Sequence, residues 1–179
     1  GHGRSVAEAV LMAGEYELAG FADDGWETLR EVWGHPVLGG TEDLAALRGH
    51  AGRAVVAIGN NAARERLHGV LRGLGFELAT IVHPRAFVSP RAILGAGCTV
   101  MAGAVGGTEA QLGEGVIVNC GAIVDHHATV EDFGHLGVNA CIAGGTLLGR
   151  GGWMQAGSAL GYGVRIPAGA VLGPGQTRP

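Results

Sequence analysis

Three of the eight histidines lie within one short stretch of the second half of the sequence, at His126, His127 and His135. Histidine titrates near neutral pH, so it can take a proton from an amine or hydroxyl that attacks a carbonyl group. Asp125 directly precedes His126 and His127. A neighbouring carboxylate can hold a histidine tautomer and stabilise the imidazolium that forms. The stretch is therefore a candidate for general-base catalysis, which requires no metal and no covalent intermediate.

A six-residue repeat determines how these side chains are positioned. Counted in steps of six from Val88 to Leu172, fourteen of fifteen positions are apolar, and Gly106 is the exception. The residue two places earlier is small in thirteen of the repeats. A period of six fits neither an α-helix nor an alternating strand, but it fits short strands joined by tight turns that coil into a solenoid. The 35 glycines suit turns that need positive φ or a close backbone approach.

The repeat also predicts the direction of the candidate side chains. Asn119 and Asp125 each follow an inward residue and His135 precedes one, so strand alternation turns all three outward. His126 falls at a turn. A histidine buried in the core is therefore a poor explanation, although solvated polar residues on a coil corner would show the same pattern. A metal site formed by His126, His127 and His135 is a rival interpretation.

Residues 1–82 lack the six-residue period and indicate a small α/β unit with a parallel sheet, because helical and strand patterns alternate. The apolar spacing and the capping residues predict a helix at 5–12 ended by Gly14, a strand at 17–21, a helix capped by Thr41 that runs to Leu47, a strand at 54–58, a helix at 62–71 and a strand at 76–82.

The chain opens on Gly1-His2-Gly3, directly before the first expected helix. In α/β folds a glycine-rich loop at this place follows the first strand and points backbone N–H groups at phosphate. We therefore expect a strand upstream of Gly1.

Several short motifs, taken together with the repeat, resemble one protein family. The motifs are Gly1-His2-Gly3, Asp23-Asp24, residues 36–40, residues 57–61 and the His83-Pro84 pair that leads into the repeat. The combination resembles the hexapeptide-repeat sugar O-/N-acyltransferases related to bacillosamine and perosamine N-acetyltransferases and to sialic acid O-acetyltransferases, over the whole chain. The resemblance implies an α/β, Rossmann-like domain at 1–82 and a left-handed parallel β-helix of about five coils at 83–179.

The resemblance also implies a reaction. An acetyl group would pass from acetyl-CoA, the co-substrate, to the amino group of a nucleotide-linked amino-deoxysugar by direct attack on the thioester. The alternatives are O-acetylation of a sugar such as sialic acid and a non-catalytic β-helix binding module. His126 corresponds to the general base of the family, which an acidic residue usually follows. His127 stands in that place here, so either Asp125 or His127 would assist the base.

The remaining contacts implied by the resemblance divide between the two substrates. Those for the nucleotide sugar are His2, Asp23, Asp24, Gly59, Asn60 and Asn119. Those for acetyl-CoA are His135, Gly144, Ala156 and Gly173. Pro174 follows the last of these and has no backbone N–H to donate. Asp23 and Asp24 would also suit an ordinary turn at the end of a strand.

Composition argues against several other classes of protein. No apolar run approaches the ~18 residues of a membrane span, and no signal segment precedes the first helix, so we expect a soluble cytoplasmic protein. All 12 basic residues are arginines without a cluster and the net charge is −4, which argues against a nucleic-acid partner. The three cysteines form no CxxC pair, so neither structural zinc nor disulfides are supported. The family resemblance and the outward-facing candidates imply a homotrimer with active sites between subunits.

Overall fold

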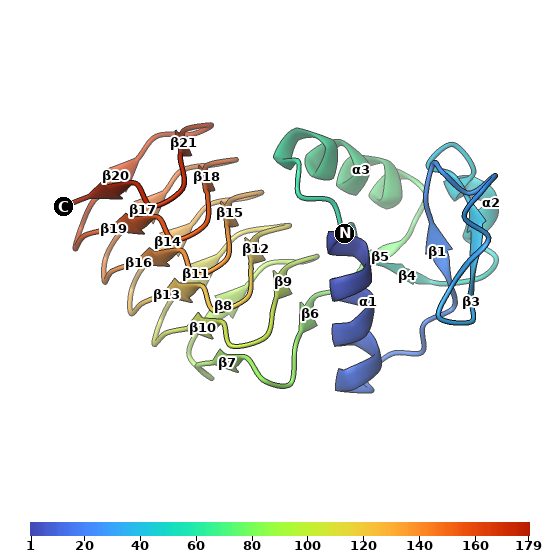
Figure 1. Ribbon diagram of the computed structural model, residues 1–179, viewed down its shortest axis with the longest axis horizontal. Helices are drawn as coiled ribbons and strands as arrows, with labels where there is room; N and C mark the ends of the chain where they lie inside the picture. Colours follow the sequence, from blue (N-terminus) through green and yellow to red (C-terminus); the bar gives the residue numbers. More distant parts are fainter.

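The computed structural model describes residues 1–179, which form a parallel β-helix and a small α/β domain (Figure 1). The α/β domain lies along one side of the β-helix and contacts coil turns as far along as Gly151. The C-terminus lies at the end of the last coil. No helix is long and apolar enough to cross a membrane.

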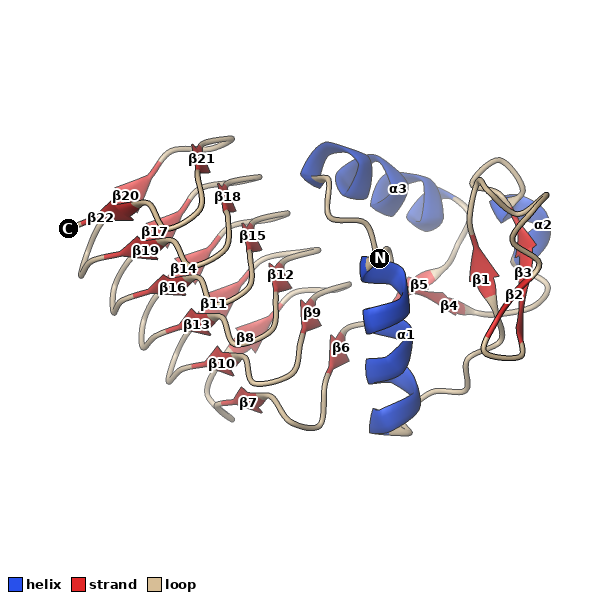
Figure 2. Cartoon of the chain, in the orientation of Figure 1, coloured by secondary structure: helices blue, strands red, loops and turns tan.

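Three flat sheets of two-residue strands form the faces of the β-helix (Figure 2). The first face contains β7 (Phe87–Val88), β10 (Val105–Gly106), β13 (Ile123–Val124), β16 (Cys141–Ile142), β19 (Ala159–Leu160) and β22 (Thr177–Arg178). The second face contains β8 (Ile93–Leu94), β11 (Gln111–Leu112), β14 (Thr129–Val130), β17 (Leu147–Leu148) and β20 (Arg165–Ile166). The third face contains β6 (Ile81–Val82), β9 (Thr99–Val100), β12 (Ile117–Val118), β15 (His135–Leu136), β18 (Trp153–Met154) and β21 (Val171–Leu172).

Turns at three corners connect these faces. The first corner joins the first face to the second, the second corner joins the second face to the third, and the third corner returns the chain to the first face. Each strand pairs in parallel with the strand 18 residues later, as Ile123 does with Cys141. Residues 18 apart therefore stack above one another, which makes the corners columns of equivalent turns.

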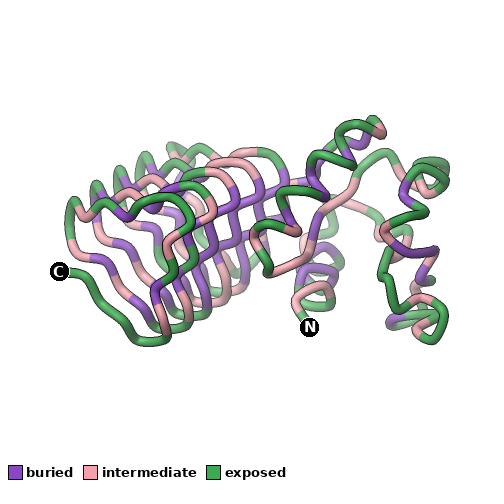
Figure 3. The backbone as a smooth tube through the Cα atoms, turned by 90° about the horizontal axis from the view of Figure 1, so that it is seen from above, coloured by how far each residue is buried: buried purple, intermediate pink, exposed green.

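The core is a column of aliphatic side chains inside the coils. Figure 3 shows the buried residues recurring along successive coils. The second residue of most strands points inward, and Val124, Val130 and Leu136 are completely buried. This confirms the six-residue repeat and its inward register. The faces have six, five and six strands, slightly more than the five coils predicted.

The boundary between the domains differs from the prediction by two residues. The segment expected as one strand at 76–82 is two strands, β5 (Glu77–Leu78), which pairs with β4 (Arg53–Ala54), and β6, which pairs with β9. The backbone N–H of Ala79 still bonds to the α/β domain, whereas that of Ile81 bonds to Cys98 of the β-helix. The coils thus begin at Ile81 rather than at residue 83.

Two of the helices follow the sequence prediction closely. Helix α1 (His2–Ala13) ends at Gly14, whose φ of 68° provides the left-handed cap. Helix α3 (Asn61–Gly73) starts at Asn60, whose side chain accepts a hydrogen bond from the Ala63 N–H. Both helices face the β-helix, with α1 packed against β6 and α3 against β5 and the second corner.

The predicted cap of the short helix α2 (Leu44–Leu47) is wrong. Asp43 precedes the helix and accepts a hydrogen bond from the Gly40 N–H. Thr41 instead donates its backbone N–H and its hydroxyl to Asp24, because the turn after β1 lies beside it.

The α/β domain contains two sheets rather than the single parallel sheet predicted. One sheet has the order β1 (Phe21–Ala22), β3 (His35–Gly39), β2 (Glu31–Val32), and the other consists of β4 and β5. A cavity of about 1430 Å³, lined mainly by apolar side chains, lies between them. Residues 55–58 have no strand beside them to pair with, so β4 is shorter than the expected strand at 54–58. Likewise, β1 covers only the end of the strand expected at 17–21.

Gly106, the exception to the apolar repeat, leads to a stability prediction. A methyl group there would meet the Val88 side chain at 3.7 Å, an ordinary contact, and no positive φ requires glycine. Gly106→Ala is expected to stabilise the protein by about 0.5–1 kcal/mol, because alanine loses less backbone entropy on folding. Denaturant unfolding would measure the change. Gly149→Ala is the opposite control, since its Cβ would lie 2.5 Å from the Ala168 backbone. Equal losses of stability in both variants would contradict the prediction.

Candidate active site

The turn from β13 to β14 carries Asp125, His126 and His127 at the first corner. The two histidine rings are nearly perpendicular, and their Nδ1 atoms lie 2.9 Å apart. On its far side, His127 Nε2 lies 3.0 Å from a carboxylate oxygen of Glu109, one coil earlier in the same corner. Roughly half of the His126 side chain is exposed, at 51%. The first corner therefore presents an accessible imidazole, that of His126, whose Nδ1 is held by His127.

Asp125 takes a different position from His127. Its Oδ1 accepts a hydrogen bond from the His126 backbone N–H at 2.7 Å, and its Oδ2 lies 3.9 Å from His126 Nε2. That second distance is too long for a hydrogen bond. The nitrogen of His126 that has a side-chain partner is thus Nδ1, and the partner is His127. No protein group hydrogen-bonds to Nε2.

Gly144, one coil after His126, leaves room for the His126 ring. A Cβ at this glycine would collide with the ring, so any larger residue would displace the imidazole. Tyr162, one coil further along the same column, lies with its ring centroid 6.4 Å from that of His126. The ring thus rests on the stacked corner turns of the following coils.

His135 lies in β15 on the third face, and its surroundings differ from the prediction. Its side chain points away from the coil, as expected, but it is only 7% exposed because the α/β domain covers this face. Nδ1 lies 3.2 Å from the carbonyl oxygen of Gly59, and the ring stacks on Trp153. A carbonyl only accepts, so Nδ1 carries the proton and Nε2 keeps a lone pair, which has no partner in the protein.

A fully buried arginine connects the two domains beside His135. Arg64 of α3 donates from Nε to the Gly115 carbonyl at 2.7 Å and from Nη2 to the Phe133 carbonyl at 2.7 Å, both in second-corner turns. Its remaining N–H groups are directed at the carbonyls of Ile58 and Gly59 and at the side chain of Asn61. All five donors of the guanidinium are therefore used without any carboxylate.

Burial and this arginine keep the neighbouring histidines neutral. Burial, reinforced by the charge of Arg64, lowers the pKa of His135 to about 4. The pKa of His2 is lowered by burial first and then by Arg64 and the N-terminal amine. The ring nitrogen Nε2 of His2 is also buried without a partner. The domain junction thus holds two neutral histidines whose buried Nε2 atoms have no partner in the protein.

The lowered pKa of His135 predicts a pH-dependent stability. Between pH 6.5 and about 4 the unfolded chain binds a proton that the folded protein excludes, so His135 destabilises the fold as the pH falls. The free energy of unfolding should drop by about 1.4 kcal/mol per pH unit in this range. His135→Asn should remove that slope, whereas His50→Asn, at an exposed site, should retain it. Parallel curves for all three proteins would contradict the prediction.

Comparison with known proteins extends over both domains. Residues 1–71 match the PglD N-terminal domain family. A histidine-to-asparagine variant of perosamine N-acetyltransferase from Caulobacter crescentus, solved in complex with CoA and GDP-perosamine, is 34% identical over 99% of this chain and 86% of that chain, with a TM-score of 0.88. The acetyltransferase domain of PglB from Neisseria gonorrhoeae, solved with acetyl coenzyme A, is 36% identical over 96% and 90%, with a TM-score of 0.82.

A curated relative, UDP-N-acetylbacillosamine N-acetyltransferase of Bacillus subtilis, is 32% identical over 112 residues. The match covers 57% of this chain and 48% of that enzyme, so the chain spans about half the length of this relative. The chain belongs to the hexapeptide-repeat sugar acyltransferases. Membership in this acyltransferase family confirms the predicted fold, an α/β domain followed by a left-handed parallel β-helix.

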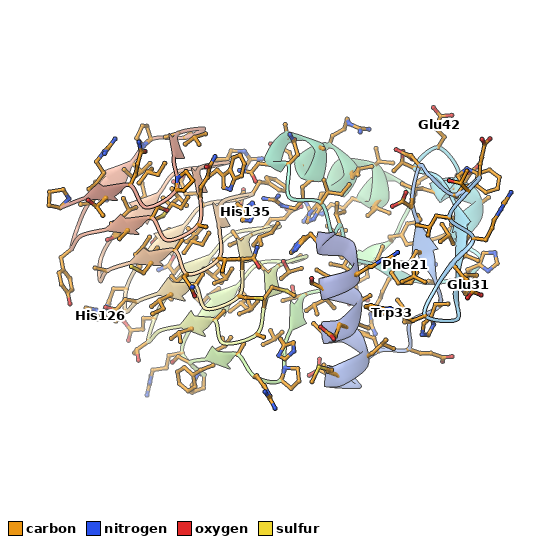
Figure 4. The ribbon with its side chains drawn as sticks, viewed as in Figure 1. Phe21, Glu31, Trp33, Glu42, His126 and His135 are labelled. Carbon is orange, nitrogen blue, oxygen red and sulfur yellow. The ribbon has the colours of Figure 1, made fainter.

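Several of the predicted site residues form two groups on opposite sides of the β-helix (Figure 4). His126 lies at the first corner, whereas His135 lies on the third face, which is opposite that corner. Gly59 and His2 accompany His135, and Gly144 accompanies His126. One chain does not bring the three histidines of the rival metal site together, and no other cluster of metal-ligating side chains occurs.

Other predicted contacts lie apart from both groups. Asn119 occupies the third corner, where its Oδ1 accepts from the Cys120 N–H, and Ala156 and Gly173 lie in later turns of the same corner. Asp23 and Asp24 lie in the turn after β1 and accept hydrogen bonds there from Gly25 and Thr41, respectively.

Sequence reasoning missed two residues of these groups. Glu109 stands 18 residues before His127, and the stacking of equivalent turns one coil apart was the signal for it. Arg64 gave no such signal, because its partners are carbonyl oxygens of turns distant in the sequence.

Proposed function

We propose that this protein is an acetyl-CoA-dependent N-acetyltransferase that acts on the amino group of a nucleotide-linked amino-deoxysugar. The observation that carries the proposal is His126, which is half-exposed at a coil corner, with Nδ1 held by His127 and Nε2 free. The similarity to a perosamine N-acetyltransferase in complex with CoA and GDP-perosamine supports both classes of substrate.

The free nitrogen suits a general base. In the proposed reaction, Nε2 takes a proton from the sugar amine as the amine attacks the thioester carbonyl of acetyl-CoA. The new C–N bond forms, the C–S bond breaks, and the proton returns from the imidazolium to the departing CoA sulfur. Backbone N–H groups of the glycine turns would stabilise the oxyanion.

The domain junction suits the nucleotide sugar. The N-termini of α1 and α3 lie at His2 and Asn61, next to Gly59, and the N-terminus of a helix favours phosphate. His2 and Gly59 would then contact the nucleotide part, and Asn119 the sugar. The contacts of Asp23 and Asp24 with the nucleotide remain predictions.

We infer a homotrimer, because within one subunit His126 lies on the opposite side of the β-helix from the junction between the two domains. A three-fold assembly with its axis along the coils would place the first corner of one subunit beside a neighbouring subunit. The first face supports such packing, since Phe87 and Ile123 are 61% and 41% exposed on it. Light scattering should therefore give three times the mass of the chain. A stable and fully active monomer would contradict this assembly.

An acetyl-transfer assay tests the proposed function. Free thiol would be followed with acetyl-CoA and a panel of UDP-, GDP- and dTDP-linked amino sugars, with free sialic acid included. We expect thiol release only with an amino-sugar nucleotide and an amide in the product. Turnover of sialic acid alone would indicate an O-acetyltransferase. The absence of turnover and of any thermal stabilisation by acetyl-CoA would indicate a binding module.

A further inference from the structure

Glu109, His127 and His126 form a hydrogen-bonded chain across two coils of the first corner. We propose that Glu109 is a positioning residue, which acts through His127 to fix the tautomer and orientation of His126. This inference rests on the proposed role of His126 as the general base. The chain is defined by the 3.0 Å distance from the Glu109 carboxylate to His127 Nε2 and the 2.9 Å distance between the two Nδ1 atoms.

Glu109 and His127 share their backbone conformation with equivalent residues of other coils but differ from most of them in not being glycine. In fourteen consecutive coil turns, from residue 97 to residue 175, the same position has a positive φ, and ten of these positions are glycine. Glu109 and His127 have φ values of 58° and 56°. A residue with a Cβ is strained in this region by about 1–2 kcal/mol. Strained residues of this kind cluster at functional sites.

The strain is not offset by ordinary packing. Phe133, another non-glycine residue with this conformation, is buried and packs against His68 and Arg150. The side chains of Glu109 and His127, in contrast, are 54% and 61% exposed and contact one another one coil apart. An exposed ion pair contributes little to stability, about 0–1 kcal/mol. The Glu109–His127 pair is therefore better explained by its effect on the tautomer and orientation of His126.

The carboxylate of Glu109 determines which ring nitrogens carry protons in this hydrogen-bonded chain. An ionised carboxylate only accepts hydrogen bonds, so Nε2 of His127 carries a proton. In a neutral His127 its Nδ1 is then the acceptor, and the Nδ1–H of His126 must donate to it. A neutral His126 with its proton on Nδ1 has a lone pair on Nε2, the atom without a hydrogen-bond partner. Glu109 thus selects the tautomer that the proposed base requires.

The hydrogen-bonded chain of Glu109, His127 and His126 also accommodates the positive charge that develops in the reaction. When Nε2 of His126 takes a proton, the Nδ1 proton can shift to Nδ1 of His127, which becomes an imidazolium paired with Glu109. Atoms and charge balance without any further reactant. The other groups facing these rings are Asp125, whose Oδ2 lies 3.9 Å from His126 Nε2, and the neutral ring of Tyr162.

Glu109→Gly gives the sharpest test, because its effects on stability and on rate should have opposite signs. Glycine relieves the positive φ, so the melting temperature should rise. The rate should fall on the order of 10-fold in kcat/KM, since the tautomer is no longer selected. Glu109→Gln should lower kcat/KM similarly and move the acid limb of the pH profile to lower pH. Glu77→Gln, at an exposed ion pair of the α/β domain, is the control and should leave kcat/KM unchanged.

A double-mutant cycle locates the action of Glu109. If the carboxylate acts through His127, Glu109→Gln should change kcat/KM little in a His127→Ala background. Additive effects would overturn the positioning role, and so would a Glu109→Gly enzyme with the rate and pH profile of the wild type. Either result, obtained while His126→Asn is inactive, would leave the proposed function intact. An active His126→Asn enzyme would instead refute the base itself.

Discussion

Replacement of His126 by asparagine is expected to lower kcat by about 10²–10⁴-fold while the affinity for acetyl-CoA stays near that of the wild type. Asparagine keeps a similar size and can hydrogen-bond to His127, but it has no basic nitrogen. Because the side chain is half-exposed and lies outside the core, the fold should be retained. Single-turnover kinetics and acetyl-CoA titration would separate the chemical step from binding.

The pH profile adds a second measurement of the His126 role. The wild-type profile of kcat/KM should have an acid limb where the general base becomes protonated, and His126→Asn should lose it. His50→Asn, an exposed histidine of the α/β domain, is the matched control and should behave as the wild type. Near-normal turnover of His126→Asn together with an inactive His127→Ala enzyme would show that His127, not His126, is the general base.

The sequence predicts the β-helix well because its determinants are local and periodic. Each hexad supplies one inward aliphatic residue and one turn, and the repeat of three hexads brings residues 18 apart into contact. The directions of Asn119, Asp125 and His126 follow from that count alone. Even the left-handed conformation of His127 follows from the glycines at equivalent positions.

The surroundings of the site depend on contacts that no local pattern encodes. His135 points outward, as predicted, yet it is buried, because α3 and the Gly59 loop dock onto the third face. The partner of the His126 ring depends on side-chain rotamers, which select His127 over Asp125. In the α/β domain, where the strands are short and weakly periodic, the predictions of a single parallel sheet and of Thr41 as the cap of α2 were wrong.

Removal of the buried guanidinium of Arg64 is expected to have the largest effect on stability. Arg64→Met would fill much of the same volume but leave the carbonyls of Gly115 and Phe133 without their donor. A buried polar group that loses its partner costs about 1–3 kcal/mol, so the variant should lose about 3–5 kcal/mol. Denaturant unfolding would measure the loss, and Arg66→Met, on the exposed side of the same helix, should change little.

Arg64→Lys separates the charge of this residue from its donors. Lysine retains the positive charge but has at most three N–H groups, which cannot reach five acceptors on both domains. The stability of this variant should therefore lie between those of the wild type and Arg64→Met. The pKa of His135 should stay low in the lysine variant and rise in the methionine variant, because the Arg64 charge is the second cause of its depression after burial. NMR titration of the His135 ring would follow this difference. An Arg64→Met protein with wild-type stability and an unchanged pKa of His135 would refute the role of Arg64 at the junction.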